Sequence, residues 1–279
     1  MSVIYRRPLA YPATSGQGWP DRTNTGVPTG TSLTPFSGNF ETSSNGQIIQ
    51  DLDISGAFVI QHTPLTIRRC RVIMPISEIG ALYVAGSVHG GLITFEDCEL
   101  DGQNKAGCSG IFYDSNSDPP NLVVRRTWIH RVENGVGCLS NFEMYDSLID
   151  DLDPAGADPH TDGLQTSENA SDVIIQHNAF RMDGPNTGPN NSCLQFDNDS
   201  VTNFRWDVVD NLFLLDPVTG GACVRIPLGN ASANDLRVRN NRMTPGDFEY
   251  RIPGPPDAAT NHITEWSGNV DHLTEAVIP

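Results

Sequence analysis

The chain has 279 residues and a formal net charge of −17 at neutral pH. A field of this sign repels nucleic acid and anionic membrane surfaces at long range, so we expect neither as a partner. The 26 glycines and 20 prolines, with Lys105 as the single lysine, favour turn-rich β structure over long surface helices. No stretch reaches the roughly 18 apolar residues of a membrane span, and no signal peptide is visible at the N-terminus.

Residues 1–45 are rich in Pro, Gly, Thr and Ser and show little alternation of apolar and polar residues. This composition predicts an extended N-terminal arm or cap. The arm either docks on another protein or forms the path of the chain to the first repeating unit. We place a domain boundary here and assign residues 46–279 to one domain.

A pattern recurs along residues 46–279: a β-rich run, then a small or polar residue, then a large apolar one. Its copies end 20 to 33 residues apart, a spacing that stacked solenoid coils with variable loops would produce. The copies are Leu65–Val72, Leu92–Leu100, Leu122–Ile129, Phe142–Ile149, Val173–Phe180, Phe204–Phe213, Leu236–Met243 and His262–Val270.

A second strand of three residues lies in each coil, starting with Phe58–Ile60. Strand residues alternate between faces, so its first and third residues point into the coil and its middle residue points out. Together the two strand types predict an all-β fold, a right-handed parallel β-helix (solenoid) of about eight coils with an extended N-terminal arm. We expect a cap at the C-terminal end, with a short helix in Asp271–Ile278.

One column of small or polar residues lies two positions before the aligned ends: Cys70, Cys98, Thr127, Ser147, Asn178, Asn211, Asn241 and Gly268. Stacked about 4.8 Å apart, its asparagines would chain hydrogen bonds along the helix axis. The same register places Cys70 over Cys98 and Cys193 over Cys223. We favour stacked reduced thiols there over disulfides.

The outward residues of the second strand form another column: Val59, Tyr83, Phe112, Gly137, Gln165, Gln195, Arg225 and Arg251. Aromatic rings stack on sugar faces, amides bond hydroxyl groups, and arginine clamps carboxylates, so this column predicts a polysaccharide-binding track. The alternative is an ordinary solvated strand face.

The loop that enters one of these strands favours the first interpretation. His160 lies between Asp158 and Asp162 there, and Gly163 permits a sharp turn that would aim these side chains at Gln165. His160, Asp158 and Asp162 are therefore the candidate catalytic residues. The candidate substrate ligands are six members of the track, with Asp197 beside them: Tyr83, Phe112, Gln165, Gln195, Arg225 and Arg251.

Three mechanisms fit these residues. In a lyase, His160 removes the C5 proton of a uronate while Arg225 or a metal offsets its carboxylate. In a hydrolase, Asp162 shares acid and base roles with Asp158 or Asp197. In a binding protein, Asp162 caps backbone amides instead.

No cofactor or metal site is predicted from these residues. Calcium is a lesser alternative, with oxygen ligands from four aspartates: Asp153, Asp158, Asp162 and Asp183.

The run HTDGLQ at 160–165 resembles the H-x-DG-[IL]-Q signature of pectate-lyase-like right-handed β-helix proteins. These are found among polysaccharide-active bacterial proteins and actinobacteriophage minor tail proteins. The resemblance implies a phage minor tail or tail-spike protein that recognises or degrades host polysaccharide. Such a protein would be located in the virion, contact other tail proteins through residues 1–45 and form a homotrimer. The alternative is a secreted bacterial lyase or glycoside hydrolase.

A second resemblance is shorter. The triplet DPH at 158–160 is similar to a motif of mannuronan C5-epimerases and alginate lyases, which pair the histidine with a tyrosine and basic residues. Here Lys105 is expected two rungs, about 10 Å, from the His160 loop, so that set is incomplete.

Overall fold

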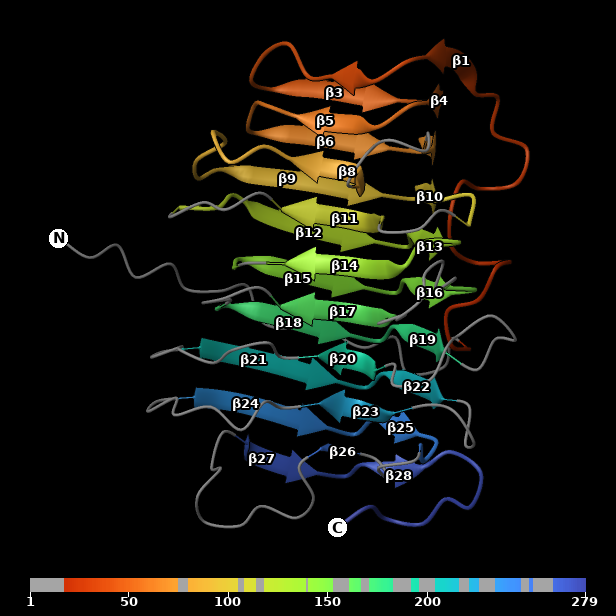
Figure 1. Cartoon of the computed structure of the whole chain (residues 1–279), viewed down its shortest axis with the longest axis vertical. Helices are drawn as coiled ribbons and strands as arrows, with labels where there is room; N and C mark the ends of the chain where they lie inside the picture. Colours follow the sequence, from red (N-terminus) through yellow and green to blue (C-terminus); the bar gives the residue numbers. More distant parts are fainter. Residues whose placement is uncertain are drawn as a thin grey trace, which may run out of the picture.

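The computed structural model describes residues 18–74, 80–104, 108–113, 118–138, 140–152, 161–166, 171–182, 192–195, 204–215, 221–225, 234–246, 251–252 and 263–279. Every regular element in these ranges is a β-strand, and no helix among them is long and apolar enough to cross a membrane. The strands form three long sheets that stack coil on coil as a right-handed parallel β-helix (Figure 1). The predicted fold class is thereby confirmed.

Each complete coil contributes one strand to each sheet, β28 begins a last, partial coil, and neighbours in every sheet are parallel. Sheet 1 consists of β1 (Thr34–Ser37), β4 (Leu52–Ser55), β7 (Arg71–Ile73), β10 (Glu99–Asp101), β13 (Trp128–His130), β16 (Leu148–Asp150), β19 (Ala179–Met182), β22 (Leu212–Leu215), β25 (Arg242–Met243) and β28 (Val270–Asp271). Sheet 2 consists of β2 (Phe40–Glu41), β5 (Phe58–Ile60), β8 (Gly80–Val84), β11 (Ser109–Tyr113), β14 (Asn134–Cys138), β17 (Asp162–Thr166), β20 (Ser192–Gln195), β23 (Ala222–Arg225) and β26 (Arg251–Ile252). Sheet 3 consists of β3 (Gln47–Gln50), β6 (Leu65–Arg68), β9 (Leu92–Glu96), β12 (Asn121–Arg125), β15 (Phe142–Tyr145), β18 (Val173–Gln176), β21 (Phe204–Val209), β24 (Asn234–Arg239) and β27 (Ile263–Ser267).

The core is built from inward columns that stack in register along the axis. In sheet 1 the aligned ends pair as predicted from Val72 through Phe180 to Met243, and all of them are fully buried. Full burial of each such side chain contributes about 1.5–3 kcal/mol, so the columns supply much of the driving force for coiling.

A sharp corner joins sheet 3 to sheet 1 in every coil and divides each predicted copy into two strands. The corner residue adopts positive φ, which is sterically costly for any residue with a Cβ. The corner residues, in order along the stack, are Asp51, Arg69, Asp97, Arg126, Asp146, His177, Asp210, Asn240 and Gly268.

Opposite charges alternate along most of this corner column. Arg69 Nε donates to Asp51 Oδ1 and Arg126 Nε donates to Asp97 Oδ1, each over 2.6 Å. Nδ1 of His177 lies 2.7 Å from Asp146 Oδ1, and this hydrogen bond raises the pKa of His177. The corner therefore offsets part of its backbone strain with charge-assisted hydrogen bonds.

The predicted polar ladder is confirmed over its asparagines. The side-chain oxygens of Asn178, Asn211 and Asn241 accept hydrogen bonds from the backbone N–H one rung earlier, each over 2.9 Å. The last member is Asn269, not Gly268, because Asn241 N donates to Asn269 Oδ1 over 3.0 Å. All these asparagines are fully buried, so the ladder satisfies backbone groups that water cannot reach.

The cysteines follow the predicted stacking as well. Cys70 N donates to Cys98 Sγ over 3.3 Å, and the pairing of β20 with β23 places Cys193 beside Cys223. All four are buried free thiols, as is Cys108.

The N-terminal region departs from the prediction. β1 pairs with β4 and β2 pairs with β5, so the coil stack begins at Thr34, inside the range assigned to the arm. Residues 18–33 lie along the outer face of sheet 1, where they run beside the coils (Figure 1). Trp19 stacks on His177 and Arg22 forms an ion pair with Asp150 over 2.8 Å, so this part of the arm contacts the β-helix itself.

The C-terminal cap is not the expected helix. Residues 272–274 form a turn, and Val277 bridges Val270 antiparallel. A register shift between Leu236 and Arg237 against β27 adds one residue to the last coil. Met243 therefore pairs with Asp271 instead of the predicted Val270.

Candidate functional site

The outer face of sheet 2 carries the predicted track. Strand pairing aligns its members one rung apart, in the order Val59, Tyr83, Phe112, Gly137, Gln165, Gln195 and Arg225. All seven are partly exposed, while their strand neighbours Leu82, Ile111 and Leu164 are buried in the core. Sequence reasoning thus identified a real continuous surface column.

The last predicted member was placed wrongly. Ile252, not Arg251, pairs with Arg225, and Arg251 pairs with the inward residue Val224. Arg251 therefore does not continue the column by register.

The aromatic half of the track is Tyr83 and Phe112. Their rings lie parallel, with centroids 6.0 Å apart and an angle of 5° between the planes. Gly137 comes next, and a Cβ there would meet Phe112 Cδ2 at an ordinary 3.7 Å. A side chain at Gly137 would therefore lie against the Phe112 ring.

The polar half brings three side chains to one point. One terminal amide atom of Gln195 lies 3.3 Å from Nη1 of Arg225 and 3.3 and 3.2 Å from the two Asp162 carboxylate oxygens. In one orientation the amide accepts from Arg225, and in the other it donates to Asp162. Strand register thus brings Asp162, Gln195 and Arg225 together from successive rungs.

Asp162 also has a structural task. Its side chain is almost fully buried, its Oδ1 accepts from Ser192 N over 3.1 Å, and its own backbone N–H donates to Asn134 Oδ1 over 2.9 Å. A second short polar ladder thus links β14, β17 and β20. This contact fits the backbone-capping role expected of Asp162 in a binding protein.

Several predicted residues lie outside the described ranges: His160, Asp158, Asp197, Asp153, Asp183 and Lys105. For Arg251 the structure describes only the backbone. The lyase set, the hydrolase pairs and the calcium ligands therefore stay predictions.

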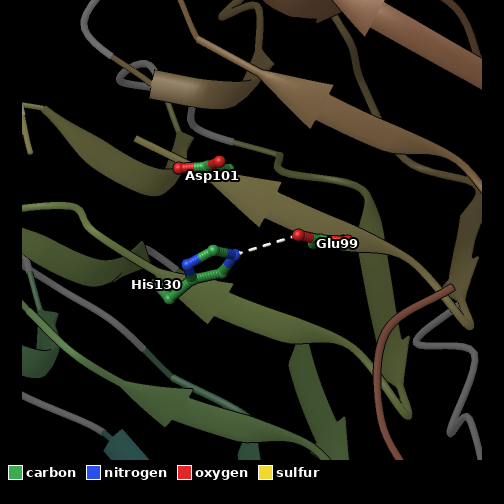
Figure 2. A group of neighbouring side chains, drawn as sticks. All are labelled: Glu99, Asp101 and His130. Carbon is green, nitrogen blue, oxygen red and sulfur yellow. Dashed lines mark hydrogen bonds and ion pairs between the residues drawn. The ribbon is translucent and has the colours of Figure 1, made fainter. Parts of the chain in front are cut away.

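A second cluster, which sequence reasoning missed, lies on the outer face of sheet 1. Glu99 and Asp101 project from β10, and His130 projects from the neighbouring β13 (Figure 2). One ligand atom from each lies within 4.8 Å of the other two. The signal was available, because these residues flank the aligned ends Leu100 and Ile129, and strand alternation points such neighbours outwards together.

Comparison with known proteins adds no relative to this picture. No protein-family model matches the chain, and neither the curated proteins nor the solved structures contain a significant match.

Proposed function

We propose that the outer face of sheet 2 binds an extended host polysaccharide and that the chain is a glycan-recognising component of a phage tail. The observation that carries the proposal is the column from Val59 to Arg225, in which six outward side chains and Gly137 lie in register. Parallel rungs repeat at about 4.8 Å, which gives a repeating polymer regularly spaced contacts along one straight wall.

The two halves of the column would make different contacts. Tyr83 and Phe112 offer adjacent partly exposed rings for the apolar faces of sugars. Gln165 and Gln195 offer amides for hydroxyl groups, and Arg225 offers a guanidinium for a carboxylate substituent. The assignment to a phage tail rests on the HTDGLQ resemblance at 160–165.

Binding is better supported than cleavage. Asp162, the one described member of the catalytic triplet, is almost fully buried and holds the backbone of Ser192. A lyase or hydrolase remains the alternative, and its chemistry would depend on His160 and Asp158.

A glycan array of bacterial capsular and cell-wall oligosaccharides, followed by calorimetry on the strongest hit, tests the proposal. The Phe112→Ala variant loses an aromatic contact worth about 1–1.5 kcal/mol, so we expect its Kd for the oligosaccharide to rise roughly tenfold. Ile48→Ala is the matched control, because Ile48 is an exposed apolar residue on sheet 3. This variant should bind the oligosaccharide as tightly as the wild type.

The same oligosaccharides separate binding from catalysis. New absorbance from unsaturated ends would reveal a lyase, and reducing ends without that absorbance would reveal a hydrolase. Equal affinities of wild type and Phe112→Ala for every hit would refute the sheet 2 track.

A further inference from the structure

We propose that Glu99, Asp101 and His130 form a binding site for a divalent first-row transition-metal ion, with Zn²⁺ as the representative. The site lies on sheet 1 and is independent of the polysaccharide track on sheet 2. Its three side chains come from two adjacent coils, with Asp101 paired directly to His130 in the strand register (Figure 2). A bound ion would therefore cross-link two rungs.

The spacing of the donor atoms suits a small ion. His130 Nε2 lies 3.1 Å from Glu99 Oε1, and the three ligand atoms lie within 4.8 Å of one another. Even if all three separations had this upper value, a central ion would lie about 2.8 Å from each atom, against the 2.0–2.2 Å of zinc–nitrogen and zinc–oxygen bonds. Side-chain movements of less than about 1 Å would close the site.

The imidazole of His130 is held in place by its surroundings. The Trp128 ring stacks on it with centroids 3.8 Å apart and 14° between the planes. Trp128 Nε1 in turn donates to Asp150 Oδ1 over 2.7 Å, and Arg22 Nε donates to Asp150 Oδ2 over 2.8 Å. An indole that is itself hydrogen-bonded thus fixes the plane of the ligand ring.

The carboxylate of Asp101 is supported in the same way. Its Oδ1 accepts from Gln103 N over 2.9 Å, and its Oδ2 is ion-paired with Arg131. Each oxygen keeps a lone pair for a metal. Supporting contacts of this kind orient metal ligands. The positive charge of Arg131 also offsets the repulsion between the carboxylates of Asp101 and Glu99.

The donor set selects the class of ion. One imidazole nitrogen with two carboxylates suits zinc and its first-row neighbours, whereas calcium and magnesium prefer oxygen donors throughout. His130 and Asp101 expose only 5% and 7% of their side chains, so an ion there would lose much of its water. Three protein ligands leave the fourth tetrahedral position for water.

Calorimetry of the full chain with ZnCl₂, after dialysis against a chelator and then into chelator-free buffer, tests the site. We expect one saturable equivalent in the wild type, and at least tenfold weaker binding in both Glu99→Gln and His130→Gln. His177→Gln is the matched control, because His177 also pairs with a carboxylate, Asp146, and belongs to no three-ligand group among the described residues. It should bind zinc like the wild type.

Glu99→Gln guards against a folding artefact, because glutamine can still accept the hydrogen bond from His130 and Glu99 is the most exposed of the three ligands. Circular dichroism checks each fold, and Co²⁺ absorption bands report ligand geometry. If the wild type binds no zinc, or if folded Glu99→Gln binds it as tightly as the wild type, the site does not exist.

Discussion

Replacement of Asn211 by alanine tests whether the asparagine ladder stabilises the coil stack. The Asn211 Oδ1 atom accepts from the backbone N–H and the side-chain Nδ2 of Asn178, over 2.9 and 3.1 Å. Its Nδ2 donates to Ile175 O, Val209 O and Asn241 Oδ1 over 2.8–3.0 Å. Alanine removes all five contacts at a site without solvent access.

The expected cost follows from these contacts. A net contribution of about 1 kcal/mol per hydrogen bond, with the added penalty for buried donors left unsatisfied, gives a loss of about 3–5 kcal/mol. Cys98→Ala in the same column is the control, because Cys98 Sγ accepts one long bond from Cys70 N and donates one to Glu96 O. We expect that variant to lose about 1–2 kcal/mol.

Urea unfolding followed by circular dichroism measures both values, and unchanged m-values would show that the same surface unfolds. The reasoning fails if Asn211→Ala loses less than about 1 kcal/mol, or no more than Cys98→Ala. In either case the ladder would satisfy the backbone without stabilising it.

Three further predictions concern other parts of the stack. The pKa of His177 is raised in the folded protein, so protonation of His177 stabilises the fold. This stabilisation is complete at a pH below the pKa of histidine in the unfolded chain, near 6.5, and disappears as the pH rises through the folded pKa. NMR titration should place that pKa above 6.5, and Asp146→Asn should bring it down. Gly135→Ala would put a Cβ 2.3 Å from Gly163 O and should destabilise by about 1–3 kcal/mol, whereas Gly137→Ala should stay within about 0.5 kcal/mol in the same urea assay. Trp19→Ala uncovers the apolar patch formed with Leu148 and Leu212, and limited proteolysis should then cut residues 18–33 faster than in the wild type.

The sequence predicted the middle of the fold well because two physical rules act there together. Strand alternation separates inward from outward residues, and the small or polar column marks the corner, so Asn178, Asn211 and Asn241 align without knowledge of the loops. At each of these three rungs the strand periodicity and the asparagine side chain predict the same position.

The predictions for the two ends of the coil stack were wrong for identifiable physical reasons. The extra residue in β27 leaves no mark in the hydrophobic pattern, so the last coil was misaligned by one position. Arg251 was misplaced because the loop before β26 carries no register information. The first coil, Thr34–Gln50, contains few inward apolar residues, so the composition assigns its residues 34–45 to the arm. The Glu99, Asp101 and His130 cluster follows from the same strand alternation on sheet 1, but no sequence motif marks it, because Glu99 and His130 lie 31 residues apart in two coils.

The corner column between sheets 3 and 1 has a consequence for the order in which coils pair during folding. From Asp51 to Asp210 its members are acid, base, acid, base, acid, histidine and acid. The corner residues of adjacent coils thus carry opposite charges, whereas those of coils two apart carry charges of the same sign. A nascent coil that docks on the wrong neighbour, with one turn looped out, would press like charges together. The column therefore penalises misthreaded intermediates, and this selection weakens once His177 loses its proton.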